Sequence, residues 1–190
     1  MRAATITPLR AAASAPQTAP PRTIDEALAR HLDALYATAR VLCREPALAE
    51  DLVQDTALAA FRNWGDLREP AAAKSWLLKI LHRRFFNVRR FDSHRPPVHD
   101  VELDRLLEQP ELAHDVAPFP DTFARQAVLD SLRTLPTAFA EVAWLVDALE
   151  LTIAEVADVL DIPVGTVGSR LHRARRMLHE RLAAVATEAP

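Results

Sequence analysis

The chain has 190 residues, of which 49% are apolar and 26% charged, so it is long enough for one ordinary domain or two small ones. It contains only three glycines and one tyrosine, which favours helices over sheets, and no apolar run reaches the roughly 18 residues of a membrane-spanning helix. The net charge of −3 points to no particular partner, while the single cysteine, Cys43, excludes an internal disulfide and fits the reducing cytoplasm.

The charges are distributed in blocks along the chain. Residues 74–95 carry seven Lys and Arg against one acid, residues 100–121 carry seven acids against one Arg, and residues 170–181 carry five Arg against one Glu. An acidic segment therefore separates two basic ones, which the net charge conceals. Residues 1–24 contain no acid and are rich in Ala, Pro and Thr. A transit peptide has a similar composition, but a disordered tail is the favoured interpretation.

Helical periodicity begins after this tail. Apolar residues at three- and four-residue steps over 28–42 predict a first helix. Pro46 indicates the start of a second helix and Gly65 its end, and Pro70 starts a third that continues towards Arg90. In the second helix the residues expected to face inward are Leu52, Val53, Ala57, Ala60, Phe61 and Trp64. The pattern predicts a small helical domain over residues 25–91.

A linker and a second helical domain are expected next. Residues 92–122 contain five prolines and scattered acids, which predicts a flexible acidic linker. Residues 123–186 return to helical periodicity. The expected fold class is all-α, with two small helical domains.

Residues 151–176 carry the pattern of a helix-turn-helix. Thr152 and Glu155 form a capping box, and residues 161–163 form a short turn into the next helix. The residues expected to face inward are Ile153, Val156, Ala157, Leu160, Val167, Leu171, Ala174 and Leu178. On another face of the last helix lie Thr166, Arg170 and Arg173, with Ser169 and Arg176 beside them. Such a face is suited to the major groove of DNA, although a solvated basic face is the alternative.

Two further helices carry patterned polar residues. Lys79, Arg83, Asn87 and Arg90 form one stripe on the third helix, which also carries Trp76, Phe85 and Phe86. Cations hold phosphates and aromatic rings stack on unpaired bases, but these rings could equally belong to a core. On the second helix Asp51, Gln54 and Asp55 lie one turn apart, either as a docking face for a basic partner or as acids near a helix N-terminus.

These motifs together resemble one protein family. Residues 49–56 (AEDLVQDT), residues 75–80 (SWLLKI), the Leu-Pro pair at 135–136 and residues 151–176 are similar, in this order, to regions two and four of the extracytoplasmic-function (ECF) sigma factors of the sigma-70 class. Three positions depart from the family pattern. Arg83 stands where asparagine is common, Gly168 where a larger polar residue is common, and Asp161 where glycine is frequent.

The resemblance implies a role in transcription initiation for both domains. Docking on core RNA polymerase, at the clamp helices of its largest subunit and at its flap region, would involve Asp51, Leu52, Gln54 and Asp55. Recognition and melting of the minus-ten element, with capture of the non-template strand, would involve Lys74, Trp76, Lys79, Arg83, Phe86, Asn87 and Arg90. Reading of the minus-thirty-five element in duplex DNA would involve Thr166, Ser169, Arg170, Arg173 and Arg176. The linker would enter the nucleic-acid channels of the polymerase, and an anti-sigma factor is an expected partner.

Two other functions are alternatives to this one. A conventional transcription regulator would use the helix-turn-helix but leave the acidic and aromatic helices unexplained. An enzyme or metal protein would have to use the seven dispersed histidines, which show no ligand spacing, and no catalytic motif is present. We therefore expect no catalytic residues, no cofactor and no metal.

Overall fold

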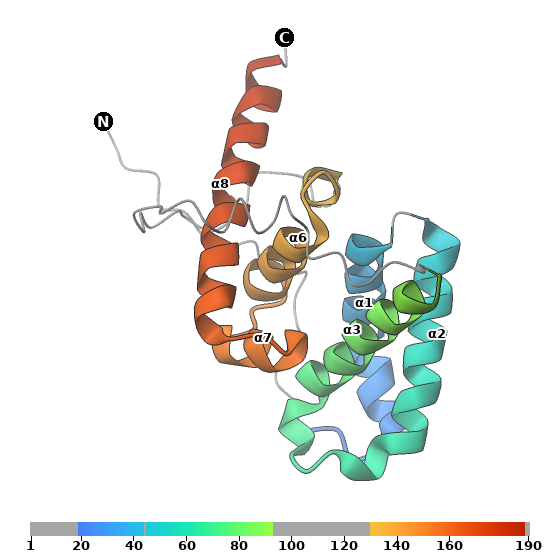
Figure 1. The fold of residues 1–190 in the computed structure, drawn as a ribbon. Helices are drawn as coiled ribbons and strands as arrows, with labels where there is room; N and C mark the ends of the chain where they lie inside the picture. The colour runs from blue at the N-terminus through green and yellow to red at the C-terminus, as the bar shows by residue number, and fades with distance from the viewer. Residues whose placement is uncertain (1–18, 44, 93–129, 189–190) are drawn as a thin grey trace.

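The computed structural model describes residues 19–43, 45–92 and 130–188, and every regular element in these ranges is helical. The first block comprises α1 (Ile24–Leu42), α2 (Pro46–Asn63) and α3 (Ala73–Asp92). The second comprises α6 (Thr137–Ala143), a π-helical turn η3 (Trp144–Ala148), α7 (Ile153–Leu160) and α8 (Val164–Glu188). Figure 1 shows α6 and α7 beside α1 and α3. The expected all-α fold with two helical units is confirmed, and the described residues include no helix apolar and long enough to cross a bilayer.

Local chemistry explains where the helices of the first block begin. The hydroxyl of Thr23 accepts a hydrogen bond from the Glu26 amide at 3.2 Å, which caps α1. Pro46 occupies the first turn of α2, as predicted, since a helix needs no amide hydrogen there. The second helix ends at Asn63 rather than at Gly65, which lies in a 3-10 turn over Trp64–Asp66. A second 3-10 turn, Pro70–Ala72, leads directly into α3.

Residues 19–23, the last part of the expected N-terminal tail, contact α1. The Arg30 guanidinium of α1 donates to the Ala19 carbonyl at 3.0 Å, and Pro21 is buried. The Arg22 amide also donates to the Glu26 carboxylate at 2.7 Å. The expected boundary of the tail at residue 24 stays a prediction. Residues 1–18 and the segment 93–129, which holds most of the expected linker, lie outside the described residues.

Both blocks contribute to one continuous apolar core. Fully buried side chains come from the first block and from the second: Leu35, Leu77, Leu78, Leu81, Leu132, Phe139, Val142, Leu145, Val156 and Leu178. Burial of this apolar surface holds the helices together, and it also holds the blocks to each other. The domain boundaries 25–91, 92–122 and 123–186 stay predictions. In the structure, the two described blocks pack against each other through this shared core.

Two apolar residues expected to face inward do not. Phe61, near the end of α2, is 50% exposed, and Ile153, the first residue of α7, is 39% exposed. Both lie at helix ends, where a neighbouring helix need not extend far enough to cover the periodic face. The predicted stripe of α8 is confirmed, because Val167, Leu171, Ala174 and Leu178 are buried.

Candidate nucleic-acid interface

The sequence between α7 and α8 forms the expected helix-turn-helix. The Thr152 hydroxyl accepts from the Glu155 amide at 3.2 Å, and the Glu155 carboxylate accepts from the Thr152 amide at 2.8 Å, which completes the capping box. At the other end of α7 the Ile162 amide donates to the Ala157 carbonyl at 3.1 Å. Asp161 adopts the left-handed conformation in this turn, with φ 55° and ψ 47°. The turn is therefore closed by backbone bonds, and α8 starts at Val164.

The residues predicted to read duplex DNA are only partly accessible. Ser169 is exposed and its hydroxyl donates to the Thr166 carbonyl at 3.1 Å, while Thr166 and Arg170 are half-buried. The Arg176 Nε atom lies 3.8 Å from the Glu180 carboxylate one turn later. Arg173 differs, because only 7% of its surface is exposed. In this conformation Arg173 is not on the accessible surface of α8, and its role as a base reader stays a prediction.

The exposed side of α3 carries the cationic and aromatic side chains expected of a helix that binds a single strand of DNA. Arg83 and Asn87 are exposed, and Phe86 is 41% exposed beside the buried Phe85, with the two ring centroids 5.2 Å apart. Trp76 is half-buried and makes an edge-to-face contact with Trp64, with centroids 5.9 Å apart. The side chain of Arg90 lies outside the described part of α3. An accessible ring next to a cation and an amide can stack on an unpaired base and hold its phosphate.

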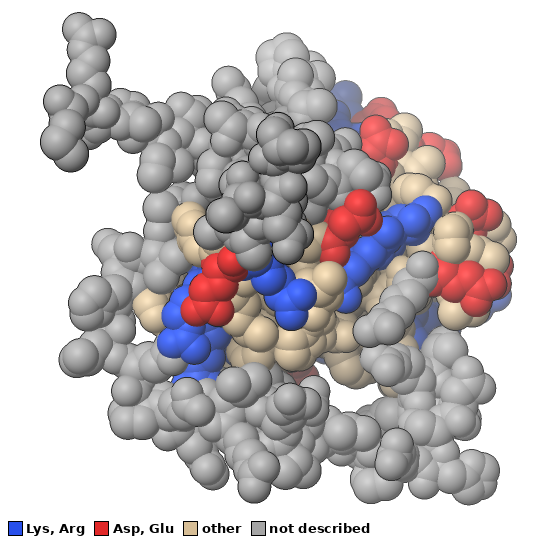
Figure 2. Space-filling view, turned by 90° about the horizontal axis from the view of Figure 1, so that it is seen from above, with Lys and Arg blue, Asp and Glu red and all other residues tan. Residues whose placement is uncertain are grey.

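Two lysines of α3 are turned towards the second block instead. The Lys74 ammonium donates to the Leu149 carbonyl at 2.5 Å, and the Lys79 ammonium lies 2.5 Å from the Asp158 carboxylate. Burial lowers the pKa of Lys74 from its usual value, and the charges of Glu150 and Glu155 partly offset this effect. In Figure 2, Lys and Arg side chains form separate groups with Asp and Glu beside them. The visible face is thus not one continuous basic surface.

The polar residues of α2 form the acidic surface expected from their spacing. Asp51, Gln54 and Asp55 are all exposed on one side of the helix. Leu52 does not belong to this surface, because it is only 7% exposed and packs in the core. A shallow hollow of about 270 Å³ adjoins the acidic surface between α1 and α2, and Leu32, Tyr36 and Gln54 line it. The sequence did not predict this hollow. In the structure it is marked by the exposed side chains of Leu32 and Tyr36.

Three polar pairs that sequence reasoning missed connect α6 and η3 to the rest of the fold. The Arg175 guanidinium makes two bonds, 2.6 and 3.1 Å long, to the buried Asp147 carboxylate. His82 Nδ1 lies 2.8 Å from the Glu141 carboxylate, and the Trp144 indole donates to the Thr38 hydroxyl at 3.0 Å. The one available signal was an acid at 141 and another at 147 within the otherwise apolar run 138–149. Buried acids need partners, but the sequence does not name them.

The described residues offer no alternative site of metal chemistry. No group of three or more His, Cys, Asp or Glu side chains in the described ranges is arranged to hold a metal ion. Of the histidines, His31, His82, His172 and His179 lie in different helices or far apart on one, and residues 94, 99 and 114 lie outside the described residues.

Comparison with known proteins assigns both blocks. Residues 27–95 match the family described as Sigma-70 region 2, and residues 125–178 match Sigma-70, region 4. The ECF RNA polymerase sigma factor SigM of Mycobacterium tuberculosis is 33% identical over 159 residues, which cover 81% of this chain and 74% of the relative. SigE of Mycolicibacterium smegmatis is 33% identical over 169 residues, which cover 86% of this chain but only 63% of that longer relative.

Two solved structures share the fold. The sigma factor RpoE from Bartonella quintana, crystallised with the anti-sigma factor NepR, has a TM-score of 0.62 and 26% identity, covering 84% of this chain and 96% of its own. CnrH, in complex with the cytosolic domain of CnrY, has a TM-score of 0.57 and 27% identity, covering 85% of this chain and 88% of its own. With both regions matched in order and SigM similar across most of its length, the chain belongs to the ECF RNA polymerase sigma factors of the sigma-70 family.

Proposed function

We propose that this chain is a specificity subunit that binds core RNA polymerase, recognises minus-ten and minus-thirty-five promoter elements and promotes DNA melting for transcription initiation. The observation that carries this proposal is the presence, in one ECF chain, of two helical blocks that each contain a cationic helix, α3 and α8. Two cationic helices in separate blocks can contact two sequence elements of one duplex, whereas a single helix-turn-helix contacts only one.

The acidic surface of α2 is proposed to dock on the clamp helices of the largest polymerase subunit, and the second block to contact the flap region. Asp51, Gln54 and Asp55 support this, because they are exposed together while the apolar side of α2 is in the core. Exposed carboxylates that serve no structural contact are suited to recognise a basic partner and to accelerate its association.

The two cationic helices are proposed to divide promoter recognition between them. The turn from Gly65 to Lys74 and the exposed side of α3 would hold the melted non-template strand, with Phe86 available for stacking. The N-terminal half of α8 would enter the major groove of the minus-thirty-five element, where Ser169 and Arg170 can reach base edges or phosphates. In this proposal the chain acts in the cytoplasm and has no catalytic site of its own, since the polymerase performs the chemistry.

Control by an anti-sigma factor is the expected form of regulation. The support comes from the two structural relatives, one of which was crystallised with an anti-sigma factor and the other with the cytosolic domain of a partner protein. A stress or environmental signal that releases such a partner would then activate this chain.

Binding to core polymerase in the absence of DNA tests the proposal against a conventional transcription regulator. We expect the purified chain to co-purify with core polymerase. The double substitution Asp51→Asn/Asp55→Asn should weaken the complex about tenfold, because it removes two charges from the docking surface. A matched control, Asp25→Asn/Glu45→Gln, removes two exposed charges elsewhere on the first block and should bind normally. No complex with the unmodified chain, or equal loss in both variants, would contradict the docking assignment.

A further inference from the structure

The most informative feature that the proposed contacts leave unused is the ion pair between Asp147 and Arg175. The Arg175 guanidinium makes two bonds, 2.6 and 3.1 Å long, to the two oxygens of the Asp147 carboxylate. The side chain of Asp147 is only 3% exposed and that of Arg175 is 19% exposed. Two parallel bonds between a planar guanidinium and a carboxylate fix the relative orientation of the two groups, which a single bond does not.

The backbone that carries Asp147 forms the π-helical turn η3. At its end the Leu149 amide donates to the Trp144 carbonyl five residues earlier, at 3.1 Å, and the next residue, Glu150, has a positive φ of 58°. A π-helical turn holds more residues than an α-helical turn, so it changes the direction in which the following side chains point. Positive φ angles at residues other than glycine are costly, and they persist where the surrounding structure requires them. In this backbone the Asp147 side chain points towards α8.

Arg175 lies on the side of α8 that faces the protein. It follows the buried Leu171 by four residues and precedes the buried Leu178 by three, so the three side chains share one side of the helix. The residues proposed to contact duplex DNA lie on other sides of α8, and Ser169 among them is exposed. Arg175 therefore belongs by sequence to the basic block 170–181, but its charge is matched inside the fold by a buried carboxylate.

Apolar packing alone leaves the orientation of α8 loosely defined, because the hydrophobic effect is non-directional. The buried stripe of α8 packs against α6 in the shared core. A small rotation of α8 about its own axis would keep most of this apolar burial, yet it would move Ser169 and Arg170 away from the groups that they are proposed to reach. Two directional bonds from a neighbouring element resist such a rotation.

We propose that Asp147 and Arg175 are positioning residues for the reading of the minus-thirty-five element. The pair holds α8 in the orientation that its DNA-contacting side chains need, and Arg175 itself does not contact DNA. This inference rests on the proposed role of α8 and adds two residues to it. Apolar side chains of the same size often stabilise a fold as well as a buried ion pair does, so the pair acts by defining one arrangement.

Run-off transcription from a promoter library tests the proposal, because one reaction reports the preferences at both promoter elements. Asp147→Asn keeps the shape of the side chain and removes the charge that Arg175 engages. We expect the preference at the minus-thirty-five element to fall about tenfold, the equivalent of one lost base contact. The preference at the minus-ten element should stay the same, since α3 is proposed to read it. A purely structural role predicts a different result, because less folded chain lowers the total RNA and leaves both preferences unchanged.

The variant Arg175→Lys distinguishes positioning from a direct phosphate contact. Lysine retains the positive charge but lacks the planar fork, so it cannot reproduce the two parallel bonds to Asp147. We expect this variant to lose preference at the minus-thirty-five element as Asp147→Asn does. If Arg175 instead held a phosphate, the lysine would substitute for it, and Asp147→Asn would release the cation and strengthen binding at every sequence.

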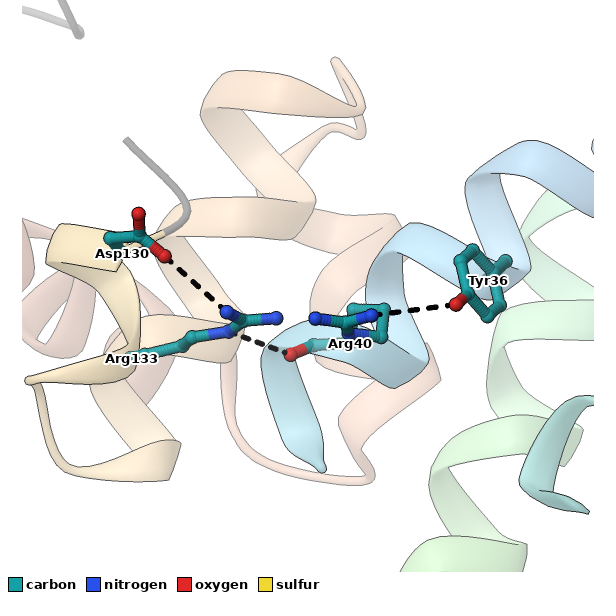
Figure 3. Close-up of polar contacts among 4 residues, drawn as sticks. All are labelled: Tyr36, Arg40, Asp130 and Arg133. Carbon is teal, nitrogen blue, oxygen red and sulfur yellow. Dashed lines mark hydrogen bonds and ion pairs between the residues drawn. The ribbon is translucent and has the colours of Figure 1, made fainter. Parts of the chain in front are cut away.

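Two matched controls come from the same block. The Arg133 guanidinium donates to the Asp130 carboxylate at 3.3 Å, a pair of the same chemical groups, but the two residues are only three positions apart in the chain (Figure 3). Asp130→Asn therefore removes the same charge without breaking a link between two elements, and it should keep both preferences. Val142→Ala opens space in the buried core of α6 and lowers the melting temperature. It should reduce the total RNA on warming without changing either preference.

The free chain provides a measurement that does not depend on transcription. Spin labels at Thr134→Cys, before α6, and at Ser169→Cys, on α8, report the position of α8 through the distribution of distances between them. The background carries Cys43→Ala, so that only the two introduced cysteines are labelled. We expect both variants of the ion pair to broaden this distribution, and the Val142 control to leave it narrow.

An unchanged minus-thirty-five preference in both variants, or an equal loss at both promoter elements, would overturn the proposal. Loss of the fold in both variants would do the same, because the pair would then be a stabilising contact only. If the unmodified chain directs no initiation, the proposed function fails, and the distance distribution still decides whether the pair holds α8. If initiation occurs while the distributions and the preferences stay unchanged, the proposed function stands and the positioning role does not.

Discussion

Asp161 has a backbone conformation that glycine adopts more easily than aspartate does. It ends α7 in the left-handed conformation, with φ 55°, which glycine adopts without steric cost and most other residues avoid. The family often has glycine at position 161, and the left-handed backbone conformation of this residue explains that preference. Asp tolerates this conformation better than a branched residue, so the turn forms despite the cost.

We expect Asp161→Gly to raise the free energy of unfolding by about 0.5–1 kcal/mol, since the strain in the folded turn outweighs the added freedom of the unfolded chain. Asp161→Val should lower it, because a branched side chain is poorly tolerated at positive φ. Urea denaturation followed by circular dichroism measures both. A destabilised glycine variant would show that the Asp side chain contributes more than the backbone conformation costs.

His31 gives the folded chain a defined response to acid. Burial, together with the positive charges of Lys74 and Arg30, lowers the pKa of His31 from its ordinary 6.5 to about 4. Between these two values the unfolded chain takes up a proton that the folded chain does not, so stability is lost as the pH falls through this window. Above pH 6.5 the imidazole is neutral in both states and contributes no pH dependence.

The substitution His31→Gln should therefore flatten the dependence of unfolding free energy on pH between 6.5 and about 4. Carboxylates titrate at the lower end of this range in both proteins, so the comparison is the difference between the two curves. Denaturation at a series of pH values measures it. Parallel curves for the two proteins would contradict the assignment.

At the scale of single helices, the sequence predicted most of what the structure shows. The start of α2 at Pro46, the capping box of α7 and the buried stripe of α8 follow from rules that act within a few residues. The exposure of Phe61 and Ile153 could not be predicted in this way, because periodicity gives the direction of a side chain but not the length of its neighbour. The burial of Arg173 could not be predicted either. Its spacing places it on the polar face of the helix, yet only 7% of its surface is exposed.

Gly168 lies on α8, the helix proposed to read duplex DNA, and is a suitable position for substitution. A Cβ atom added there would meet no atom within 4 Å, so an alanine can be accommodated without rearrangement. We expect Gly168→Ala to stabilise the fold by about 0.5–1 kcal/mol, because glycine is a poor helix former. Gly168→Lys should keep most of this gain and add a phosphate contact.

The added lysine should also steepen the salt dependence of binding to a minus-thirty-five duplex by about one released counterion, whereas Gly168→Ala should leave the slope unchanged. Fluorescence anisotropy with the chain bound to core polymerase, at several salt concentrations, gives the slopes. Identical slopes for the Lys and Ala variants would place position 168 away from the phosphate backbone.

At the scale of the whole molecule, the sequence predicted two helical units but not their packing. The partners of Lys74, Lys79 and His82 lie 59–79 residues away along the chain, and no local rule connects them. Both basic helices were predicted, yet part of the cationic surface of α3 is occupied by the second block. The surface that the sequence assigns to DNA and the surface that the folded chain presents are therefore different.

In the proposed function, this chain confers promoter specificity on a polymerase. Run-off transcription measures this most directly, with core polymerase that lacks its own specificity subunit and a library of promoter sequences as template. We expect the chain to direct initiation from a defined subset of the library that shares two sequence elements at constant spacing. RNA that starts at the same positions with and without the chain, or no specific RNA at all, would contradict the account.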